Sequence, residues 1–530
     1  MSGLFFENAA VLAPAHPNRS DVVCFIGFVS RRKGVALSAD TLAELRAGGW
    51  VDGPWRSDAA AVETLQQLPV TVESWGAFDR LFAWEQRLLS DGQEALCASY
   101  LGAAVRSFFA TGGRRAVIIR VGDPWAYVES DAQRLEQREG RLDKLLPGNS
   151  AALLPLDRYV PSTWQGIQHI YGLPQIAMVC LPDLPGLLSA SPVRIPTVVD
   201  IPASAEVFVE CSADEPPLPV DGGLRMLSAP RCDDDGFKLW ASSIRKMREF
   251  LKYNRPDVML VGAIPLPHLD ASVSRVKAEA DMLGFLQGLG ILDLSVTDAK
   301  LPVADINGPL PSTFSQLAYP WLRTFRSGDL PEGLEPPDGL FAGLVAANAL
   351  RRGTFRSVAG SLLPDVVELK PMPAWGSGPD SPAQQLAARI CLFATEPGGV
   401  ALQSDVTCSP DTAWQPGGVR RLVASVLRAA RDAGNDYVFE ANGPQLWARV
   451  RRGMEELLTG FWRQGGLGGV TANDAFKVRC DRSTMSQNDL DSGRIIVEIA
   501  LLPVASVERI TVVLNLLGGR NVQSSIREVA

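Results

Sequence analysis

The 530-residue sequence contains few of the residues that catalyse reactions or bind metal ions. It has only three histidines, His16, His169 and His268. None of them lies at a spacing typical of a metal site. Three histidines are enough for a Ser–His–Asp catalytic site, but the sequence has no GxSxG motif, which would mark the nucleophilic serine of an α/β hydrolase. We therefore expect solvent-exposed or loop histidines and predict no catalytic residue.

Nucleotide-binding motifs are also missing. No GxxxxGK[ST] occurs, and no GxGxxG follows a strand and opens a helix. The stretch "YLGAAVRSFFATGGRRAVIIRV" (residues 100–121) places its glycines after a helical pattern and before a β-branched run. Phosphates bind at helix N-termini, so this polarity favours a helix-to-strand connection over a phosphate site. We expect Arg114 and Arg115 to contact neighbouring subunits, and no cofactor site.

Several further absences narrow the class of protein. The eight cysteines form no CxxC pair and several lie in apolar runs, which favours buried free thiols over disulfides or metal ligands. No apolar run reaches about 18 residues, so no membrane span is expected. The net charge of −8 makes nucleic acid an unfavoured partner. The acidic run 233–235 does not match a calcium loop, so we expect a turn or a helix N-terminus.

What the chain does contain is alternating buried strands and amphipathic helices. This alternation predicts an α/β fold, and the length predicts two to four domains. We expect an N-terminal arm (1–20), an α/β domain (21–390) with an inserted subdomain at about 190–300, a C-terminal domain (391–507) and a final strand and arm (508–530).

The C-terminal region has the clearest pattern. Residues 443–467 form an amphipathic helical pattern, with charged residues away from its apolar face: Arg449, Arg452, Glu455 and Glu456. Strand patterns follow at 475–481, 493–504 and 508–517. Because a terminal strand with unpaired edges can join a neighbour's sheet, this arrangement favours an assembly protein over an enzyme.

Five segments, in order, resemble contractile tail sheath proteins of phages, R-type pyocins and contractile injection systems. They are "VTVESWGAFDRLFA", "AVRSFFATGGRRAVIIRV", "LAYPWLRTF", "GLFAGLVAANALRRGTFRSVAG" and the region from Tyr437 to the last strand. Together they cover about half of the chain. The resemblance implies a multidomain sheath fold with a subtilisin-like α/β middle domain, an α+β C-terminal domain and extended terminal arms.

The resemblance also implies a function. Sheath subunits stack as helical rings around an inner tube and contract to drive that tube through a target cell envelope, without catalysis, cofactor or metal. The implied partners are further copies of the chain, the inner tube, and baseplate and terminal cap proteins, with no nucleic acid and no direct membrane insertion. The implied location is the bacterial cytoplasm during assembly, and then a phage tail or injection particle that is released from the cell.

Residue roles follow from the same resemblance. The terminal arms would exchange strands between subunits, which makes contact candidates of Arg509, Ile510, Val512 and Leu514. The helix at 443–460 would touch the tube through Arg449, Arg452, Glu455 or Glu456, unless these are only solvated charges. Two alternatives remain: an α/β hydrolase-like enzyme, and a non-contractile scaffold that shares the fold.

Overall fold

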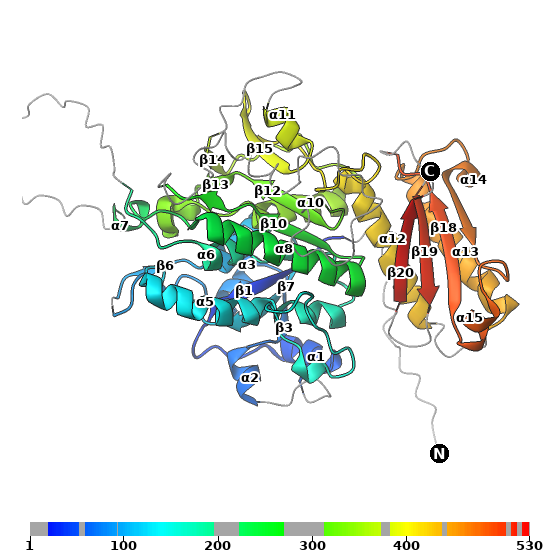
Figure 1. Cartoon of the computed structure of the whole chain (residues 1–530), viewed down its shortest axis with the longest axis horizontal. Coiled ribbons are helices and arrows are strands. Elements are labelled where there is room, and N and C mark those ends of the chain that lie inside the picture. The colour runs from blue at the N-terminus through cyan, green and yellow to red at the C-terminus, as the bar shows by residue number, and fades with distance from the viewer. Residues whose placement is uncertain are drawn as a thin grey trace, which may run out of the picture. The chain divides into compact units, whose positions relative to one another are not determined.

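The computed structural model describes residues 20–51, 59–92, 94–195, 222–269, 312–372, 382–436, 442–504, 510–516 and 522–528. These residues form two compact units (Figure 1). The sheet unit comprises the described residues of Asp21–Asn348 and Ser357–Arg420. The C-terminal unit comprises Ser20, Ala349–Arg356 and the described residues of Arg421–Ala530.

An eight-stranded sheet forms the centre of the sheet unit. Its order is β16-β15-β12-β10-β8-β1-β7-β3, and every neighbouring pair from β15 to β7 is parallel. The two outermost strands, β3 and β16, are antiparallel to their neighbours. The strands are β1 (Val22–Phe28), β3 (Pro69–Val72), β7 (Arg115–Gly122), β8 (Met178–Cys180), β10 (Met259–Ala263), β12 (Ser315–Tyr319), β15 (Cys391–Glu396) and β16 (Gly399–Leu402).

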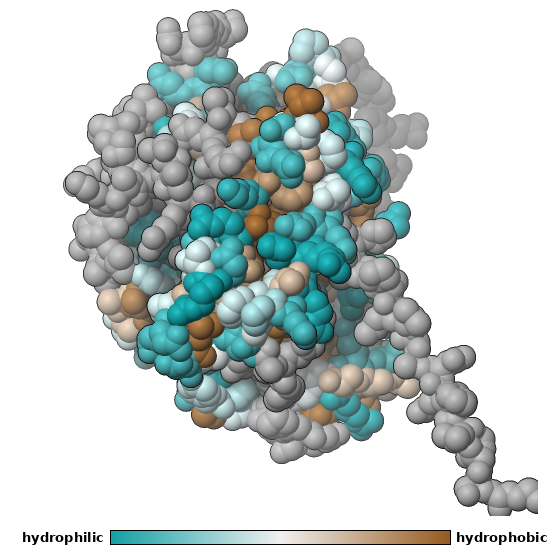
Figure 2. Space-filling model, turned by 90° about the vertical axis from the view of Figure 1, so that its right-hand side faces the viewer, coloured by the Kyte–Doolittle hydropathy of each residue, from teal (hydrophilic) through white to brown (hydrophobic). Residues whose placement is uncertain are grey.

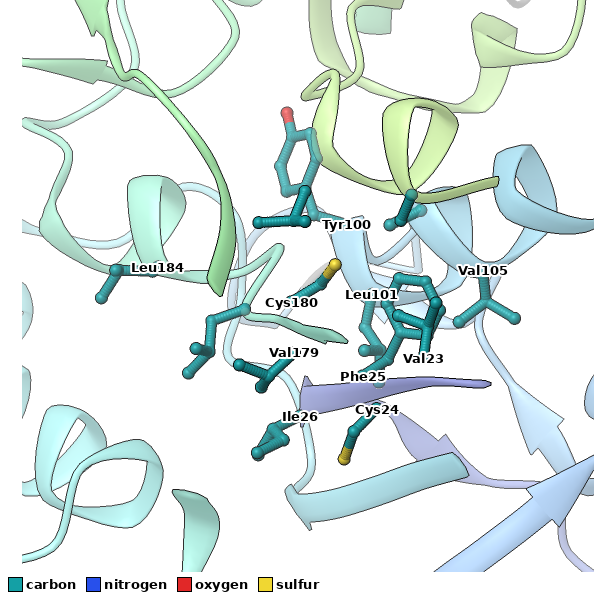
Figure 3. Close-up of a cluster of buried hydrophobic side chains, with 14 of the residues drawn as sticks. Val23, Cys24, Phe25, Ile26, Tyr100, Leu101, Val105, Val179, Cys180 and Leu184 are labelled. Carbon is teal, nitrogen blue, oxygen red and sulfur yellow. The ribbon is translucent and has the colours of Figure 1, made fainter. Parts of the chain in front are cut away.

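Strand β1 is buried on both faces, as a continuous apolar run predicts. Figure 3 shows Val23 and Phe25 pointing toward the helix that carries Leu101, while Cys24 points to the opposite face. The Phe25 and Phe108 rings meet edge to face, with centroids 5.5 Å apart. The apolar core therefore continues on both sides of the sheet.

Helices flank this sheet, and α5 and α8 lie in front of it in the view of Figure 1. The helices of the sheet unit are α1 (Ala39–Ala47), α2 (Ala59–Thr64), α3 (Trp75–Leu81), α4 (Tyr100–Ala110), α5 (Asp131–Leu145), α6 (Leu184–Leu188), α7 (Gly222–Arg225), α8 (Asp234–Asn254), α10 (Asp338–Arg351) and α11 (Pro382–Ala387). The last residues of α10 are grouped with the C-terminal unit. Shorter elements are β2 (Ser30–Arg31), β4 (Phe82–Ala83), β5 (Arg87–Leu88), β6 (Leu96–Cys97), β9 (Arg231–Cys232), β11 (Leu266–Pro267), β13 (Trp321–Thr324), β14 (Val366–Lys370), and the 3-10 helices η1 (Pro161–Thr163), η2 (Gly166–Gly172), η4 (Ser327–Asp329) and η5 (Pro331–Gly333).

A four-stranded antiparallel sheet, ordered β17-β18-β19-β20, forms the C-terminal unit together with its helices. Helix α13 packs against β17, and α12 begins in the sheet unit and continues into this one. The elements are α12 (Gly417–Asp436), α13 (Pro444–Arg463), α14 (Ala472–Ala475), α15 (Gln487–Asp491), β17 (Phe476–Arg479), β18 (Ile495–Leu501), β19 (Ile510–Leu516) and β20 (Val522–Glu528).

The helix-to-strand connection predicted at residues 100–121 is confirmed. Helix α4 ends at Ala110, and β7 begins at Arg115. Between them Gly112 has a φ of +103°, which side-chain-bearing residues rarely adopt. A Cβ on Gly113 would lie 2.4 Å from the Phe108 ring. These glycines end a packed helix and turn the chain into a core strand, so they are architectural.

The α/β prediction is confirmed at the level of a mixed fold with a mostly parallel sheet, but two expected boundaries differ. The described part of residues 190–300 is no separate subdomain, because β10 is an inner strand of the large sheet and α8 packs beside it. A C-terminal domain beginning at residue 391 is also not observed, since β15 and β16 belong to the large sheet. The N-terminal arm up to residue 19 lies outside the described residues.

Candidate assembly surfaces

The sheet of the C-terminal unit has one buried face and one accessible face. In β18 buried residues alternate with half-buried ones, and in β17 buried residues alternate with exposed ones. The buried set, which includes Val478, Val497 and Ile499, lies on the side where α13 contributes Val450, Met454 and Leu458. On the other face Arg479 pairs with Glu498 at 3.7 Å, and both side chains are substantially exposed. This accessible face is a candidate contact surface.

Strand β19 carries three of the predicted subunit-contact residues, and both of its edges are paired within the chain. Ile510, Val512 and Leu514 lie opposite Leu501, Ile499 and Val497 of β18. The same residues lie opposite Glu528, Ile526 and Ser524 of β20. The prediction that β19 is the exchanged strand therefore does not fit this arrangement, because β19 has no free edge. The fourth candidate, Arg509, lies outside the described residues.

The edges that remain open belong to β17 and β20. Each pairs with a single strand of this sheet among the described residues. Strand β20 was missed by the sequence analysis, because "VQSSIRE" has three polar residues in a row and no clear alternation. An edge strand offers a row of unpaired backbone groups to another chain. Strand β20, which has an open edge, is consequently a better candidate than β19 for pairing between subunits.

Helix α13 is confirmed as amphipathic, with a charged side away from the core. Arg449, Arg452 and Glu456 are exposed, while Glu455 is half-buried and lies 3.8 Å from Arg451, one turn earlier. Arg451 was not singled out from the sequence, although its spacing to Glu455 is that of a helical ion pair. Three arginines therefore line the solvent side of this helix. Figure 2 shows hydrophilic residues interspersed with smaller groups of hydrophobic ones over the face it presents.

Arg114 and Arg115 have different environments. Arg115 lies 3.2 Å from Glu44 and 4.0 Å from Glu73, so it forms ion pairs within its own chain. Arg114 is exposed. Of the two, Arg114 remains the candidate for a contact with another subunit.

The prediction that the histidines are solvent-exposed or lie in loops is wrong for His169. Its side chain is buried, its ring stacks on Trp50 at a centroid distance of 5.8 Å, and its two nitrogens each lie 3.0 Å from a carbonyl oxygen, of Gly166 and Gln67. His268 is half-buried near the small β9–β11 pair, and His16 lies outside the described residues. His169 therefore has a structural environment, within the core.

The position where doubly wound sheets usually bind ligands is filled by the protein itself. Ligands bind beyond the carboxyl ends of the strands, where the strand order reverses. In this sheet the strand order reverses at β1, which lies between β8 and β7. The buried carboxylate of Asp183 occupies it, accepting hydrogen bonds from the backbone N–H groups of Phe28 (2.7 Å) and Leu101 (3.2 Å). The second of these donors belongs to the first turn of α4, so a side chain takes the place of a bound anion.

The cysteines and the acidic run at residues 233–235 have structural roles in the described part of the chain. All seven cysteines in the described part of the chain are buried thiols, and Asp233 caps α8 by accepting from the Gly236 N–H at 2.7 Å. Within the described ranges, no group of three or more His, Cys, Asp or Glu is arranged to hold a metal ion. Nor does any helix described here have the length and apolar character needed to cross a membrane.

Comparison with known proteins identifies the C-terminal region. Residues 409–516 match the family model described as the phage tail sheath C-terminal domain. The match spans α12, α13 and the strands from β17 to β19. It confirms the resemblance to contractile tail sheath proteins that the sequence indicated. A search of curated proteins found no match.

Several solved structures resemble this chain at low sequence identity, and the first of the three described here shares its fold. The anti-feeding prophage baseplate in the contracted state is 16% identical, with a TM-score of 0.55, and the alignment covers 96% of each chain. The contracted sheath complex of PVC, an extracellular contractile injection system, is 16% identical, with a TM-score of 0.46, and the alignment covers 95% of this chain and 94% of that one. A sheath tail protein from Desulfitobacterium hafniense is 13% identical over 55% of this chain and 62% of its own, with a TM-score of 0.30.

Proposed function

We propose that this chain, which carries a phage tail sheath C-terminal domain at residues 409–516, is the structural subunit of a contractile sheath. Copies of it polymerise as helical rings around an inner tube and contract to drive that tube through a target cell envelope. The domain match is the observation that carries this proposal. The likeness in fold to a baseplate chain of a contracted particle agrees with it over almost the whole length.

Within this proposal, the sheet unit is a rigid body and the C-terminal unit provides the connections between subunits. The sheet unit takes the role of the subtilisin-like α/β middle domain of sheath proteins. We expect it to act without catalysis, because its ligand position is filled by Asp183 and its buried histidine, His169, bonds to backbone carbonyl groups in the core. The proposed domain layout is a sheet unit of Asp21–Asn348 and Ser357–Arg420, and an α+β C-terminal unit of Ala349–Arg356 and Arg421–Ala530, with α10 and α12 running from one unit into the other.

Connections between subunits form through main-chain pairing at β20. A strand from a neighbouring chain adds to its outer edge, or β20 itself transfers to the neighbour's β19. The N-terminal arm at residues 1–20 is the candidate donor for the first of these routes. Main-chain pairing would survive contraction while side-chain contacts elsewhere rearrange.

The inner tube is contacted by the charged side of α13. Arg449 and Arg452 attract acidic groups on the tube, and Glu456 adds an opposite charge that sets the register of the contact. The baseplate and a terminal cap bind the two ends of the polymer. Assembly takes place in the bacterial cytoplasm, and the finished particle is a phage tail or an injection device, without cofactors, nucleic acid or membrane insertion by the sheath.

Electron microscopy of the purified full-length chain tests this proposal. Expressed together with its tube protein, the chain should form striated tubes of stacked rings. A truncation after residue 521, which removes β20, should stay folded by circular dichroism but form no tubes. Isolated globular particles from the full-length chain, with tube protein present, would refute the sheath function. Normal tubes from the truncated chain would refute only the role of β20.

A further inference from the structure

Three carboxyl groups are buried together where α4 and α10 meet in the sheet unit. They belong to Asp183, Glu335 and Asp338, whose exposed fractions are 4%, 0% and 1%. Asp338 opens α10, Glu335 precedes it by three residues, and Asp183 lies beside the first turn of α4. Buried carboxylates are normally paired with a cation, because removing a charge from water is costly.

These carboxyl groups are held mostly by neutral donors. The two oxygens of Asp183 accept from backbone N–H groups, and those of Glu335 accept from the Ser107 and Thr324 hydroxyls, each at 2.7 Å. Asp338 accepts from the Gly339 N–H at 2.9 Å through Oδ1, while its Oδ2 has no hydrogen-bond donor in the described structure. An oxygen in this position is better satisfied as a hydroxyl than as half of a carboxylate.

The charged groups around the cluster do not neutralise it by direct contact. Arg87 of β5 acts on Asp183, while Arg106 of α4 and Arg326 act on Glu335, all as favourable charges at longer range. No arginine or lysine of the described chain lies within ion-pair distance of any of the three. The groups facing Asp338 are the other two carboxyls, and its own charge acts on the Cys180 thiol of β8. Like charges therefore face one another in a dry site.

Close helix packing keeps water out of this site. A Cβ on Gly339 would lie 2.3 Å from the carbonyl oxygen of Ala104, and one on Gly343 would lie 2.6 Å from that of Phe108. These two glycines, one turn apart on α10, let its backbone touch the backbone of α4. The carboxyl groups therefore remain desolvated for as long as the two helices stay in contact.

We propose that Asp183, Glu335 and Asp338 form a proton-binding site that keeps α10 docked on α4 while it holds its protons and loosens this contact when it releases them. The proposal concerns the sheet unit alone and does not depend on the sheath function. Because the residues that follow α10 belong to the C-terminal unit, the site would make the anchoring of that connecting segment sensitive to pH.

The direction of the pH effect follows from the burial of the groups. Burial raises the pKa of Asp338 to about 7, with the charges of Asp183 and Glu335 adding to the rise against the Gly339 hydrogen bond. Burial likewise raises the pKa of Asp183 to about 6 and that of Glu335 above its ordinary value. The folded state therefore holds protons that the opened state has lost. Their contribution to stability is fully present below about pH 4, where both states are protonated, and is lost as the pH rises from there through about 6 to 7.

Hydrogen exchange on the full chain, followed by mass spectrometry, tests the proposal. After correction for the intrinsic pH dependence of exchange, the opening equilibrium of α10 amides should increase about thirtyfold between pH 5.8 and 7.8. In Asp338→Asn, which keeps an acceptor for the Gly339 N–H, the increase should fall to about threefold or less, because only Asp183 and Glu335 still titrate. The exposed control Asp91→Asn should behave as the wild type does.

Two results of this experiment would overturn the proposal. A wild-type chain whose α10 opening does not change between these pH values overturns the proposal, whatever the variants do. An equal increase in Asp338→Asn and in wild type also overturns it, because the titrating group would then lie elsewhere. If Asp338→Asn fails to fold, Asp183→Asn takes its place, with an expected response smaller than that of the wild type.

Discussion

The two units of this chain differ in how their β-sheets are covered. The sheet unit buries inner strands such as β1 and β10 on both faces, and both of its outermost strands are antiparallel additions. The C-terminal unit covers one face of its sheet with α13 and leaves charged residues such as Arg479 and Glu498 on the other. The first arrangement favours internal stability, and the second leaves edges and charges available to other molecules.

The largest expected difference between the two units is the loss of stability when a tryptophan is replaced. Trp321 in the sheet unit is fully buried, donates from Nε1 to the Ile264 carbonyl at 3.0 Å and meets the Tyr100 ring edge to face. Trp321→Ala should lower the free energy of unfolding by about 4 kcal/mol. Trp462→Ala, at a half-buried position of α13, should cost less than half of that. Urea unfolding monitored by circular dichroism measures both, and equal losses would contradict the comparison.

Ion pairs should show the same contrast. Glu332 is buried and binds Arg231 through two contacts of 3.0 Å, with Lys370 at 3.3 Å. Glu332→Gln should cost about 3 kcal/mol, because Arg231 is left buried without its partner. Glu498→Gln, which breaks the exposed pair with Arg479, should cost less than about 1 kcal/mol. Thermal unfolding of both variants in the same buffer tests this, and a Glu498 effect as large as that of Glu332 would argue against it.

Removing β20 should have a smaller effect on folding than on assembly. The strand has only β19 as a partner, so truncation after residue 521 should cost about 2 kcal/mol or less of the free energy of unfolding. Polymerisation should nevertheless be lost, because β20 is the strand through which the subunits are proposed to pair. Sedimentation measures the assembled fraction, and truncation after residue 528 serves as the control that retains β20.

Surface charge should have the smallest effect on stability. Arg449→Glu combined with Arg452→Glu should lower the free energy of unfolding by less than about 1 kcal/mol but reduce co-sedimentation with the tube protein. Arg451→Glu is the control, since Arg451 already pairs with Glu455. If all these substitutions leave tube binding unchanged, α13 is not the tube-contacting surface.

Charge reversal near β7 separates the two adjacent arginines in the same way. Arg115→Glu should cost up to about 1 kcal/mol, because it places a like charge beside Glu44 and Glu73. Arg114→Glu should leave stability unchanged and weaken polymerisation only. Thermal unfolding and sedimentation, measured on both variants, distinguish these outcomes.

The sequence predicts local structure in this chain better than it predicts boundaries. Residues 100–121 and α13 follow strong periodic patterns, so their elements are found where they were expected. The boundary at residue 391 failed because a strand such as β15 gives the same local pattern whichever sheet it joins. Strand β20 was missed because its pairing with β19, rather than its own polar residues, makes it a strand. Similarly, the buried position of His169 depends on contacts with Trp50 and Gln67, about 100 residues away.

Imaging of native particles tests most directly whether this chain forms a contractile sheath. Particles purified from the producing cells should be examined by electron microscopy, with an antibody against the sheet unit to mark the chain. If the chain is a sheath subunit, the antibody decorates striated tubes, which occur in a long, narrow form and a short, wide form around a protruding inner tube. Antibody bound only to isolated globular molecules, with unlabelled tubes in the same preparation, would contradict it.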